Sequence, residues 1–228
     1  MNFQVHPRGV RSFVLRAGRM TDGQQRALDT LWPRFGLEYT ADTCDPDRLF
    51  GRAAPRIVEI GFGNGDNLIH MAQLRPDADF LGVEVHRPGV GRVLLEIERL
   101  RLTNVRVSNH DAVEVMAQQL PEGSLDEVLV LFPDPWHKKR HHKRRLVNAA
   151  FVALLATRLK SGGLLRAVTD WEPYARQMLE VLNGCALLQN TAADGAFVPR
   201  PGSRQPTRFE RRGERLGHRV WDLAFRRR

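Results

Sequence analysis

The stretch RIVEIGFGNG, residues 56–65, decides the fold of this 228-residue chain. Its first five residues have the apolar pattern of a short strand, and three glycines follow within the next five positions. A segment with the apolar spacing of a helix, residues 66–74, comes directly afterwards. A strand, a glycine loop and a helix in this order predict the first unit of a parallel sheet.

The same alternation continues along the chain. Strands are predicted at 56–60, 79–85, 104–110, 126–132, 164–170 and 218–225, and helices at 66–74, 91–102, 111–120, 144–158 and 171–183. Strands separated by helices pair in parallel through right-handed crossovers, so the expected fold class is α/β with a doubly wound sheet. Residues 1–54 contain no such unit. We therefore predict a basic N-terminal arm over 1–54 and one domain over 55–228.

Positive charge is concentrated in two segments. The chain has 35 Lys and Arg against 26 Asp and Glu, a net charge of +9. Residues 137–145 contribute +6 and residues 199–228 a further +7, which leaves −4 on the rest. This distribution favours a polyanionic partner, because each cation that meets a phosphate releases condensed counterions. The alternative is a solvated charge run with a disordered tail.

Composition argues against several classes of protein. No apolar run approaches the roughly 18 to 20 residues of a membrane span, and the first residues lack the apolar core of a signal peptide. We therefore expect a soluble, cytoplasmic protein with no membrane partner. Cys44 and Cys185 are too far apart in the chain for a thiolate zinc motif. Because His137, His141 and His142 lie among cations, we expect no metal.

The glycine loop indicates which ligands are suitable. In a doubly wound sheet, ligands bind beyond the carboxyl ends of the strands, and Gly61 and Gly63 would let a ligand approach the backbone there. A dinucleotide fingerprint would need glycine in place of Asp66, and a Walker A loop would need a Gly-Lys pair. Asp66 would also repel a pyrophosphate at the start of the helix. The loop therefore favours a ligand that has no phosphate or carries positive charge.

Acidic residues stand at the ends of three successive strands. Glu84 ends the second strand, where a carboxylate can accept hydrogen bonds from both ribose hydroxyls. Asp111 follows the third strand and can accept a bond from the exocyclic amine of adenine. Singly, Glu59 could be a charged partner within its strand, Glu84 a surface residue and Asp111 a helix cap. Together they favour a nucleoside, and S-adenosylmethionine fits because it combines adenosine with a sulfonium cation and no phosphate.

The loop after the fourth strand, FPDPWHKKRHHKRR at 132–145, carries a second pattern. Asp134 lies between two prolines, which fix the backbone and hold its carboxylate. Trp136 offers a flat face for stacking a nucleobase, and the basic run begins directly after it. These features fit a nucleotide within a polynucleotide. Prolines that merely end a strand and a tryptophan that fills the core are the alternative, which the polarity of residues 138–145 disfavours.

Together, these and further motifs resemble the bacterial tRNA (guanine-N7-)-methyltransferase family. The resemblance covers nearly the whole chain, and the FPDPW block is its most diagnostic part, since similar glycine loops occur in most methyltransferases. The matching segments are RSFVLRAGRMTDGQQRAL (11–28), EIGFGNG (59–65), GVEVHRPGVG (82–91), FPDPWHKKRHHKRR (132–145), VTDWEPYARQMLE (168–180) and RPGSRQPTRFERRGERLGHRVWDLAF (200–225).

The resemblance implies a Rossmann-like class I methyltransferase fold, with a mostly parallel sheet and an antiparallel C-terminal strand. It implies S-adenosylmethionine as cofactor, N7 of guanine 46 in the tRNA variable loop as methyl acceptor, and Asp134 as the catalytic position. The implied cofactor-binding residues are Glu59, Gly61, Gly63, Glu84, Asp111 and Asp134. The implied substrate-binding residues are Lys138, Asp170, Thr207, Arg208, Phe209 and Glu210, and the implied RNA contacts are Arg140, Lys143, Arg144 and Arg145. We expect a monomer, with a homodimer as the alternative.

Three other functions compete with this interpretation. Adenine-N6 and cytosine-N4 methyltransferases use a proline pair between a polar residue and an aromatic, whereas only Pro135 separates Asp134 from Trp136. A non-catalytic RNA-binding protein on a decayed methyltransferase fold is disfavoured by the intact glycine loop and the acidic residues. A nicotinamide-dependent dehydrogenase is disfavoured by Asp66 and by the loop around Asp134.

Overall fold

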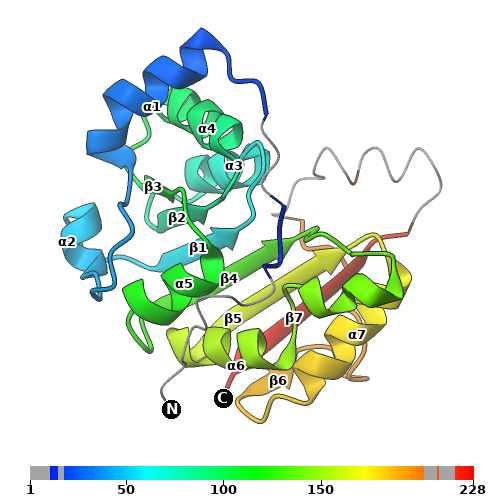
Figure 1. Ribbon diagram of the computed structural model, residues 1–228. Coiled ribbons are helices and arrows are strands. Elements are labelled where there is room, and N and C mark those ends of the chain that lie inside the picture. The colour runs from blue at the N-terminus through cyan, green and yellow to red at the C-terminus, as the bar shows by residue number, and fades with distance from the viewer. Residues whose placement is uncertain (1–10, 15–17, 203–209, 211–218) are drawn as a thin grey trace.

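The chain folds around a seven-stranded sheet with the order β3-β2-β1-β4-β5-β7-β6 (Figure 1). This computed structural model describes residues 11–14, 18–202, 210 and 219–228. Neighbours among β1 to β5 pair in parallel, and β7 is antiparallel to β5 and β6. The α/β class and the antiparallel C-terminal strand are therefore confirmed. The strands are β1 (Arg56–Ile60), β2 (Asp79–Val83), β3 (Val105–Ser108), β4 (Leu125–Leu131), β5 (Leu159–Thr169), β6 (Leu188–Asn190) and β7 (Trp221–Arg227).

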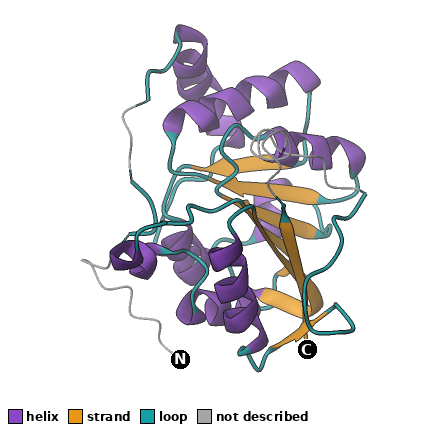
Figure 2. Ribbon diagram, turned by 90° about the vertical axis from the view of Figure 1, so that its right-hand side faces the viewer, coloured by secondary structure: helices purple, strands orange, loops and turns teal. Residues whose placement is uncertain are grey.

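Helices cover both faces of the sheet (Figures 1 and 2). Alternate residues of β1 feed opposite cores: Ile57 packs with α1, α3 and α4, whereas Val58 packs with η1, α6 and α7. Burial on both faces explains why the central strands are apolar almost throughout. The helices are α1 (Asp22–Phe35), α2 (Pro46–Phe50), α3 (Asp66–Leu74), α4 (Arg87–Leu100), α5 (Ala112–Glu114), the π-helical turn η1 (Val115–Gln119), the 3₁₀ helix η2 (Lys139–Arg144), α6 (Ala149–Arg158) and α7 (Glu172–Asn183).

The register of the sheet brings four loops to one edge. Ile60 at the end of β1 pairs with Val83 of β2 and Val130 of β4. The hydrogen bonds continue one residue further, from Gly61 N to Val83 O at 2.8 Å and from Glu84 N to the end of β3 at 3.0 Å. The loops after these strands therefore start nearly level with one another, where a doubly wound sheet binds its ligands.

Helix α1, which lies within the predicted N-terminal arm of residues 1–54, belongs to the packed core. Its first turn is closed by a capping box between Thr21 and Gln24. Its buried Leu28 and Phe35 lie in the same core as α4. The backbone N–H of Leu37, just beyond the helix, donates to the edge strand β3 at 2.7 Å. Residues 21–37 are thus packed against the sheet rather than apart from it.

Two predicted helices begin elsewhere. The helix predicted at 144–158 begins at Ala149, because Asn148 caps it by accepting a hydrogen bond from Phe151 N at 3.1 Å. Residues 139–144 form η2 instead. The helix predicted at 91–102 begins earlier, with Pro88 in its first turn, where its missing N–H is harmless.

Truncation of Phe35 tests whether α1 contributes to global stability. Phe35 is 4% exposed, so Phe35→Ala should lower the free energy of unfolding by about 3 to 4 kcal/mol through lost burial and a residual cavity. Urea unfolding measures this loss. Leu74→Ala is the matched control, because Leu74 is 55% exposed and its truncation should change stability by no more than about 0.5 kcal/mol. Equal stability of Phe35→Ala and wild type would contradict a core role for α1.

Candidate active site

A cavity of about 200 Å³ lies at the carboxyl ends of β1 to β4. Its wall includes Gly61 after β1, Glu84 after β2, Asp111 after β3 and Asp134 after β4. The structure therefore brings together four of the predicted cofactor-binding residues, one from each loop. Their meeting follows from the strand register, since no two of them are close in the sequence.

The glycine loop leaves open space beside its backbone. Gly61 and Gly63 have φ angles of 71° and 58°, which glycine adopts without strain. A Cβ atom added at either position would meet no atom of the described residues within 4 Å. The loop thus combines a conformation that requires glycine with room for a ligand.

Backbone groups hold the carboxylate of Glu84 in one orientation. Its Oε1 accepts from Val85 N at 2.7 Å and His86 N at 2.9 Å, and its Oε2 accepts from Gly63 N at 2.8 Å. These bonds use three of its roughly four acceptor positions. One acceptor position, on Oε2, is left for a ribose hydroxyl, and a second hydroxyl would have to share or replace an existing bond. Acceptance of both ribose hydroxyls stays a prediction.

Asp111 has two roles in the structure. It is the N-cap of α5, accepting a hydrogen bond from Val113 N at 2.9 Å, and it also lines the cavity. Burial is the main cause that raises the pKa of its carboxyl. The helix-cap reading is thus correct without excluding a ligand contact, because a carboxylate has acceptor positions left after one cap bond.

Glu59 lies beneath the glycine loop and is not among the described residues that line the cavity. It is 3% exposed, and its Oε2 accepts from Asn67 Nδ2 at 2.8 Å. Burial raises the pKa of Glu59 to about 7, although the bond from Asn67 partly opposes this. A role for Glu59 in binding the cofactor stays a prediction.

Asp134 lies where two cavities meet. Besides the small cavity, it lines a larger one of about 1070 Å³, whose wall also includes Gly63, Trp136 and Lys138. The side chain of Asp134 is exposed. A group held in the small cavity and a second molecule held in the large one would therefore both have access to Asp134.

The backbone of the loop around Asp134 is strained at both ends. Phe132 and Trp136 have φ angles of 51° and 47°, a region that bulky residues rarely occupy and that costs on the order of 1–3 kcal/mol each. Such conformations persist only where neighbouring contacts fix them. The prolines indicated rigidity from sequence, whereas this strain becomes visible only in the structure.

Arg145, one of the predicted RNA contacts, has a buried side chain, and its contact with RNA stays a prediction. Arg145 is 3% exposed and donates through Nε to Pro135 O at 2.9 Å. It also donates to Gln177 of α7, and its guanidinium lies 4.8 Å from the ring centroid of Tyr174. Arg145 thus ties the strained loop to α7 and presents no free guanidinium to a phosphate.

Arg144 and Trp136 also contact each other and residues 12–13 of the predicted N-terminal arm. The Arg144 guanidinium lies 4.1 Å from the Trp136 ring and donates to Phe13 O at 3.2 Å. Trp136 Nε1 donates to Ser12 O at 3.1 Å. Ser12 and Phe13 themselves line the small cavity, and Figure 1 shows residues 11–14 in dark blue near the ends of the strands. No motif in residues 11–14 taken alone predicts this position.

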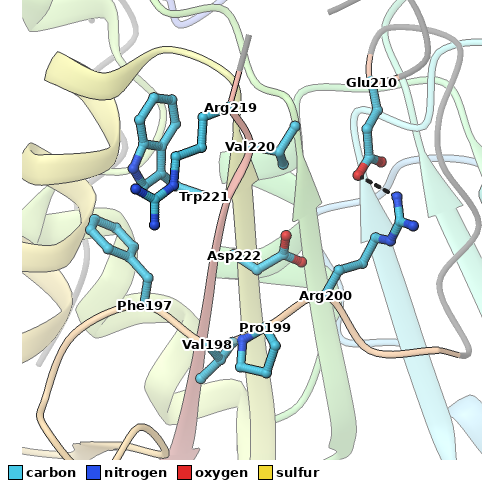
Figure 3. A pocket seen from close by; sticks show the side chains of 9 residues that line it. All are labelled: Phe197, Val198, Pro199, Arg200, Glu210, Arg219, Val220, Trp221 and Asp222. Carbon is cyan, nitrogen blue, oxygen red and sulfur yellow. Dashed lines mark hydrogen bonds and ion pairs between the residues drawn. The ribbon is translucent and has the colours of Figure 1, made fainter. Parts of the chain in front are cut away.

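The predicted substrate residues are divided between two regions. Lys138 lines the large cavity, and Asp170 directly follows β5 at the same edge of the sheet. Glu210, in contrast, lines a separate cavity of about 370 Å³ and forms an ion pair with Arg200 at 3.1 Å (Figure 3). Trp221 and Asp222 of β7 form another part of that wall. Thr207, Arg208 and Phe209 lie outside the described residues.

The remaining predicted RNA contacts, Arg140 and Lys143, are exposed on η2.

Within the described ranges, no cluster of three or more His, Cys, Asp or Glu side chains could hold a metal ion. No helix in these ranges is long and apolar enough to cross a membrane.

Replacement of Glu59 by Gln should make stability depend less on pH. Because burial raises the pKa of this carboxyl from 4.5 to about 7, ionising it costs folding free energy. That cost is absent below pH 4.5, grows as the pH rises and is complete above pH 7. Relative to wild type, Glu59→Gln should therefore gain about 2 to 3 kcal/mol between pH 4.5 and pH 8. Urea unfolding of both proteins across this range measures the gain, and a difference that does not vary with pH would contradict it.

Known proteins match nearly the whole chain. A family model described as "Putative methyltransferase" matches residues 53–223. The chain is 59% identical to a tRNA (guanine-N(7)-)-methyltransferase of Methylococcus capsulatus over 221 residues, which cover 97% of this chain and 95% of that protein. A protein of the same name from Ralstonia pickettii is 61% identical over 224 residues, or 98% of this chain and 86% of that protein.

Solved methyltransferase structures share the fold at low sequence identity. The 16S rRNA methyltransferase KamB matches with a TM-score of 0.59 and 12% identity, over 82% of this chain and 95% of that chain. The aminoglycoside resistance methyltransferase NpmB1 matches with a TM-score of 0.54 and 18% identity, over 80% and 92%. These likenesses support the class I methyltransferase fold alone. Because the relatives match at about 60% identity over nearly the full length, the chain belongs to the tRNA (guanine-N(7)-)-methyltransferase family.

Proposed function

We propose that this protein transfers a methyl group from S-adenosylmethionine to N7 of guanine 46 in the variable loop of tRNA, acting as a monomer in the cytoplasm. Membership of the family supports a tRNA guanine-N7-methyltransferase that uses S-adenosylmethionine. Position 46 is the finer part of the proposal. The single observation that carries the assignment of the site is Asp134 in the wall of both cavities.

The small cavity fits the chemistry of the cofactor. The carboxylates of Glu84 and Asp111 line it, and the space beside Gly61 is open. Acidic walls suit a ligand that is cationic and has hydroxyl and amine donors but no phosphate. When bound, S-adenosylmethionine supplies an electrophilic methyl group carried on a sulfonium cation. Glu84 would hold the ribose and Asp111 the adenine amine.

The residues around the acceptor need to position a base rather than deprotonate it. Guanine N7 carries a free lone pair and has no proton to lose, so methylation requires no strong general base. The guanine ring gains positive charge as the N7–carbon bond forms and the carbon–sulfur bond breaks, and a nearby carboxylate stabilises that charge. Asp134 would supply this charge and hold the purine edge in line for the reaction. Asp170, which follows the adjacent strand β5, would assist in holding the base.

Nucleoside analysis tests the reaction directly. The protein is incubated with unmodified tRNA and methyl-labelled S-adenosylmethionine, and the digested nucleosides are separated. We expect label in 7-methylguanosine, and loss of the label from a transcript in which guanine 46 is replaced by adenine. Label in N6-methyladenosine would favour the competing adenine methyltransferase interpretation, and 7-methylguanosine in the substituted transcript would move the target away from position 46.

Asp134→Asn and Asp134→Ala test the role of the carboxylate. Loss of charge stabilisation should lower kcat by about 100-fold or more, whereas the Kd for tRNA should change by less than about threefold. Single-turnover methylation and filter binding measure the two quantities. Asp42→Asn is the matched control, because Asp42 is an exposed carboxylate and its amide should behave as wild type. Wild-type turnover by Asp134→Ala would remove Asp134 from the chemistry.

The salt dependence of tRNA binding tests whether the exposed cations of η2 contact RNA. Arg140 and Lys143 are exposed, so Arg140→Ala/Lys143→Ala should weaken binding and reduce the slope of log K against log salt by about 1 to 2. The buried Arg145 provides the contrast. Arg145→Ala should leave that slope nearly unchanged but lower the melting temperature, because it removes the contacts to Pro135 and α7. An unchanged slope in the double variant would mean that these cations are only solvated.

A further inference from the structure

Trp171 is an unusual residue for its position. It is the N-cap of α7 and directly follows Asp170. Helix N-caps favour Ser, Thr, Asp or Asn, whose side-chain oxygens accept a hydrogen bond from the first turn, whereas an indole has only a donor. The indole is also 37% exposed, one of three large apolar side chains with such exposure among the described residues. Helix stability does not explain a tryptophan at this N-cap, and residues that depart from local structural preferences occur most often at functional sites.

Hydrogen bonds hold the backbone of Trp171, and a ring contact packs against its indole. Its backbone N–H donates to Thr169 Oγ1 at 3.2 Å, and its carbonyl accepts from Tyr174 N and Ala175 N at 2.9 Å each. The ring of His137 packs against the indole at 84°, with the ring centroids 4.3 Å apart. The indole is thus held by the loop after β4 while part of its surface remains open to solvent.

The other tryptophan at this edge has less free surface. The Arg144 guanidinium covers the Trp136 ring, and the indole N–H donates to Ser12 O. His141 packs edge-on against Trp136, with centroids 5.8 Å apart. Trp136, which was predicted from the sequence to stack on a base, therefore already contacts Arg144 and Ser12. Trp171 is the more accessible ring of the two.

The surroundings of Trp171 fit a single-stranded nucleic acid. His137 lines the large cavity together with Asp134 and Lys138. Lys139 and Arg140 continue from Lys138 as an exposed row. An exposed aromatic ring beside a row of cations is the combination with which proteins bind unpaired nucleotides.

Methylation at N7 also requires an unpaired neighbourhood. In an A-form helix N7 faces a deep, narrow major groove that side chains cannot read, so the target guanine must leave the stack. A nucleotide next to it then loses a stacking partner. A protein that offers an aromatic face nearby recovers part of that energy.

We propose that Trp171, steadied by His137, is a stacking platform for an unpaired nucleobase adjacent to the methylated guanine. This assignment rests on the proposed function and adds a second base-binding position to it. Because stacking accepts any base, the platform contributes affinity and placement of the RNA rather than choice of sequence.

Substitutions at Trp171 separate stacking from simple packing. Trp171→Ala should raise the KM for tRNA by about 10- to 100-fold, with a much smaller change in kcat and none in the Kd for S-adenosylmethionine. Trp171→Phe should restore KM to within a few-fold of wild type, because it keeps an aromatic face. Trp171→Leu keeps apolar volume and should behave like the alanine variant. Leu74→Ala, at another of the exposed apolar positions, should leave KM unchanged.

Fluorescence provides a readout that does not depend on methylation. Titration with single-stranded oligouridylate should quench a component of the indole emission in wild type that is absent in Trp171→Phe, although this variant still binds the RNA. Equal quenching in both proteins, or a leucine variant as active as the phenylalanine variant, would overturn the platform. If wild type forms no 7-methylguanosine, the proposed function fails, while the quenching experiment still decides whether Trp171 stacks on a base.

Discussion

The parallel, in-register pairing of β1 with β2 and β4 is the constraint on which the site depends. Ile60 is level with Val83 on one side and Val130 on the other, so the three loops that follow begin at the same height. Residues far apart in the sequence, such as Glu84 and Asp134, meet in one cavity wall for this reason. The same central position buries β1 on both faces, which requires helices on each side of the sheet.

The loop between β4 and η2 is the least relaxed part of this framework and also the part nearest the chemistry. Phe132 and Trp136 occupy a backbone region that disfavours bulky side chains. The buried Arg145 offsets this cost with a charged hydrogen bond to Pro135 O and a contact with α7. A basic residue that reads as part of an RNA-binding run therefore serves to hold the loop that carries Asp134.

Local patterns predicted the elements whose periodicity and ends are both marked in the sequence. The bounds of β1 and α3 agree with prediction, since each has its period and its end signals in sequence. The start predicted for the helix at residue 144 was wrong because non-local contacts bury Arg145 and because the local cap signal at Asn148 was not used. The sequence does contain a signal for α1 that was not used: Thr21 and Gln24 have the spacing of a capping box. The ion pair of Glu210 with Arg200 has no counterpart in local pattern.

The fold decides which of the positively charged residues lie near the site. Residues 199–228 carry +7 as a segment, but β7 runs antiparallel to β5, so Trp221 lies beside Thr169 while Arg226 lies beside Leu164 at the opposite end. Arg226 donates there to Gly162 O at 2.6 Å. The last three arginines, Arg226–Arg228, are therefore remote from Asp134, whereas Arg87 and Lys138 line the large cavity and Lys138 begins an exposed basic run over residues 138–140. Among the described residues, positive charge thus adjoins the large cavity, whereas the carboxylates of Glu84 and Asp111 line the small cavity. The two signs of charge meet near Asp134, which lines both cavities.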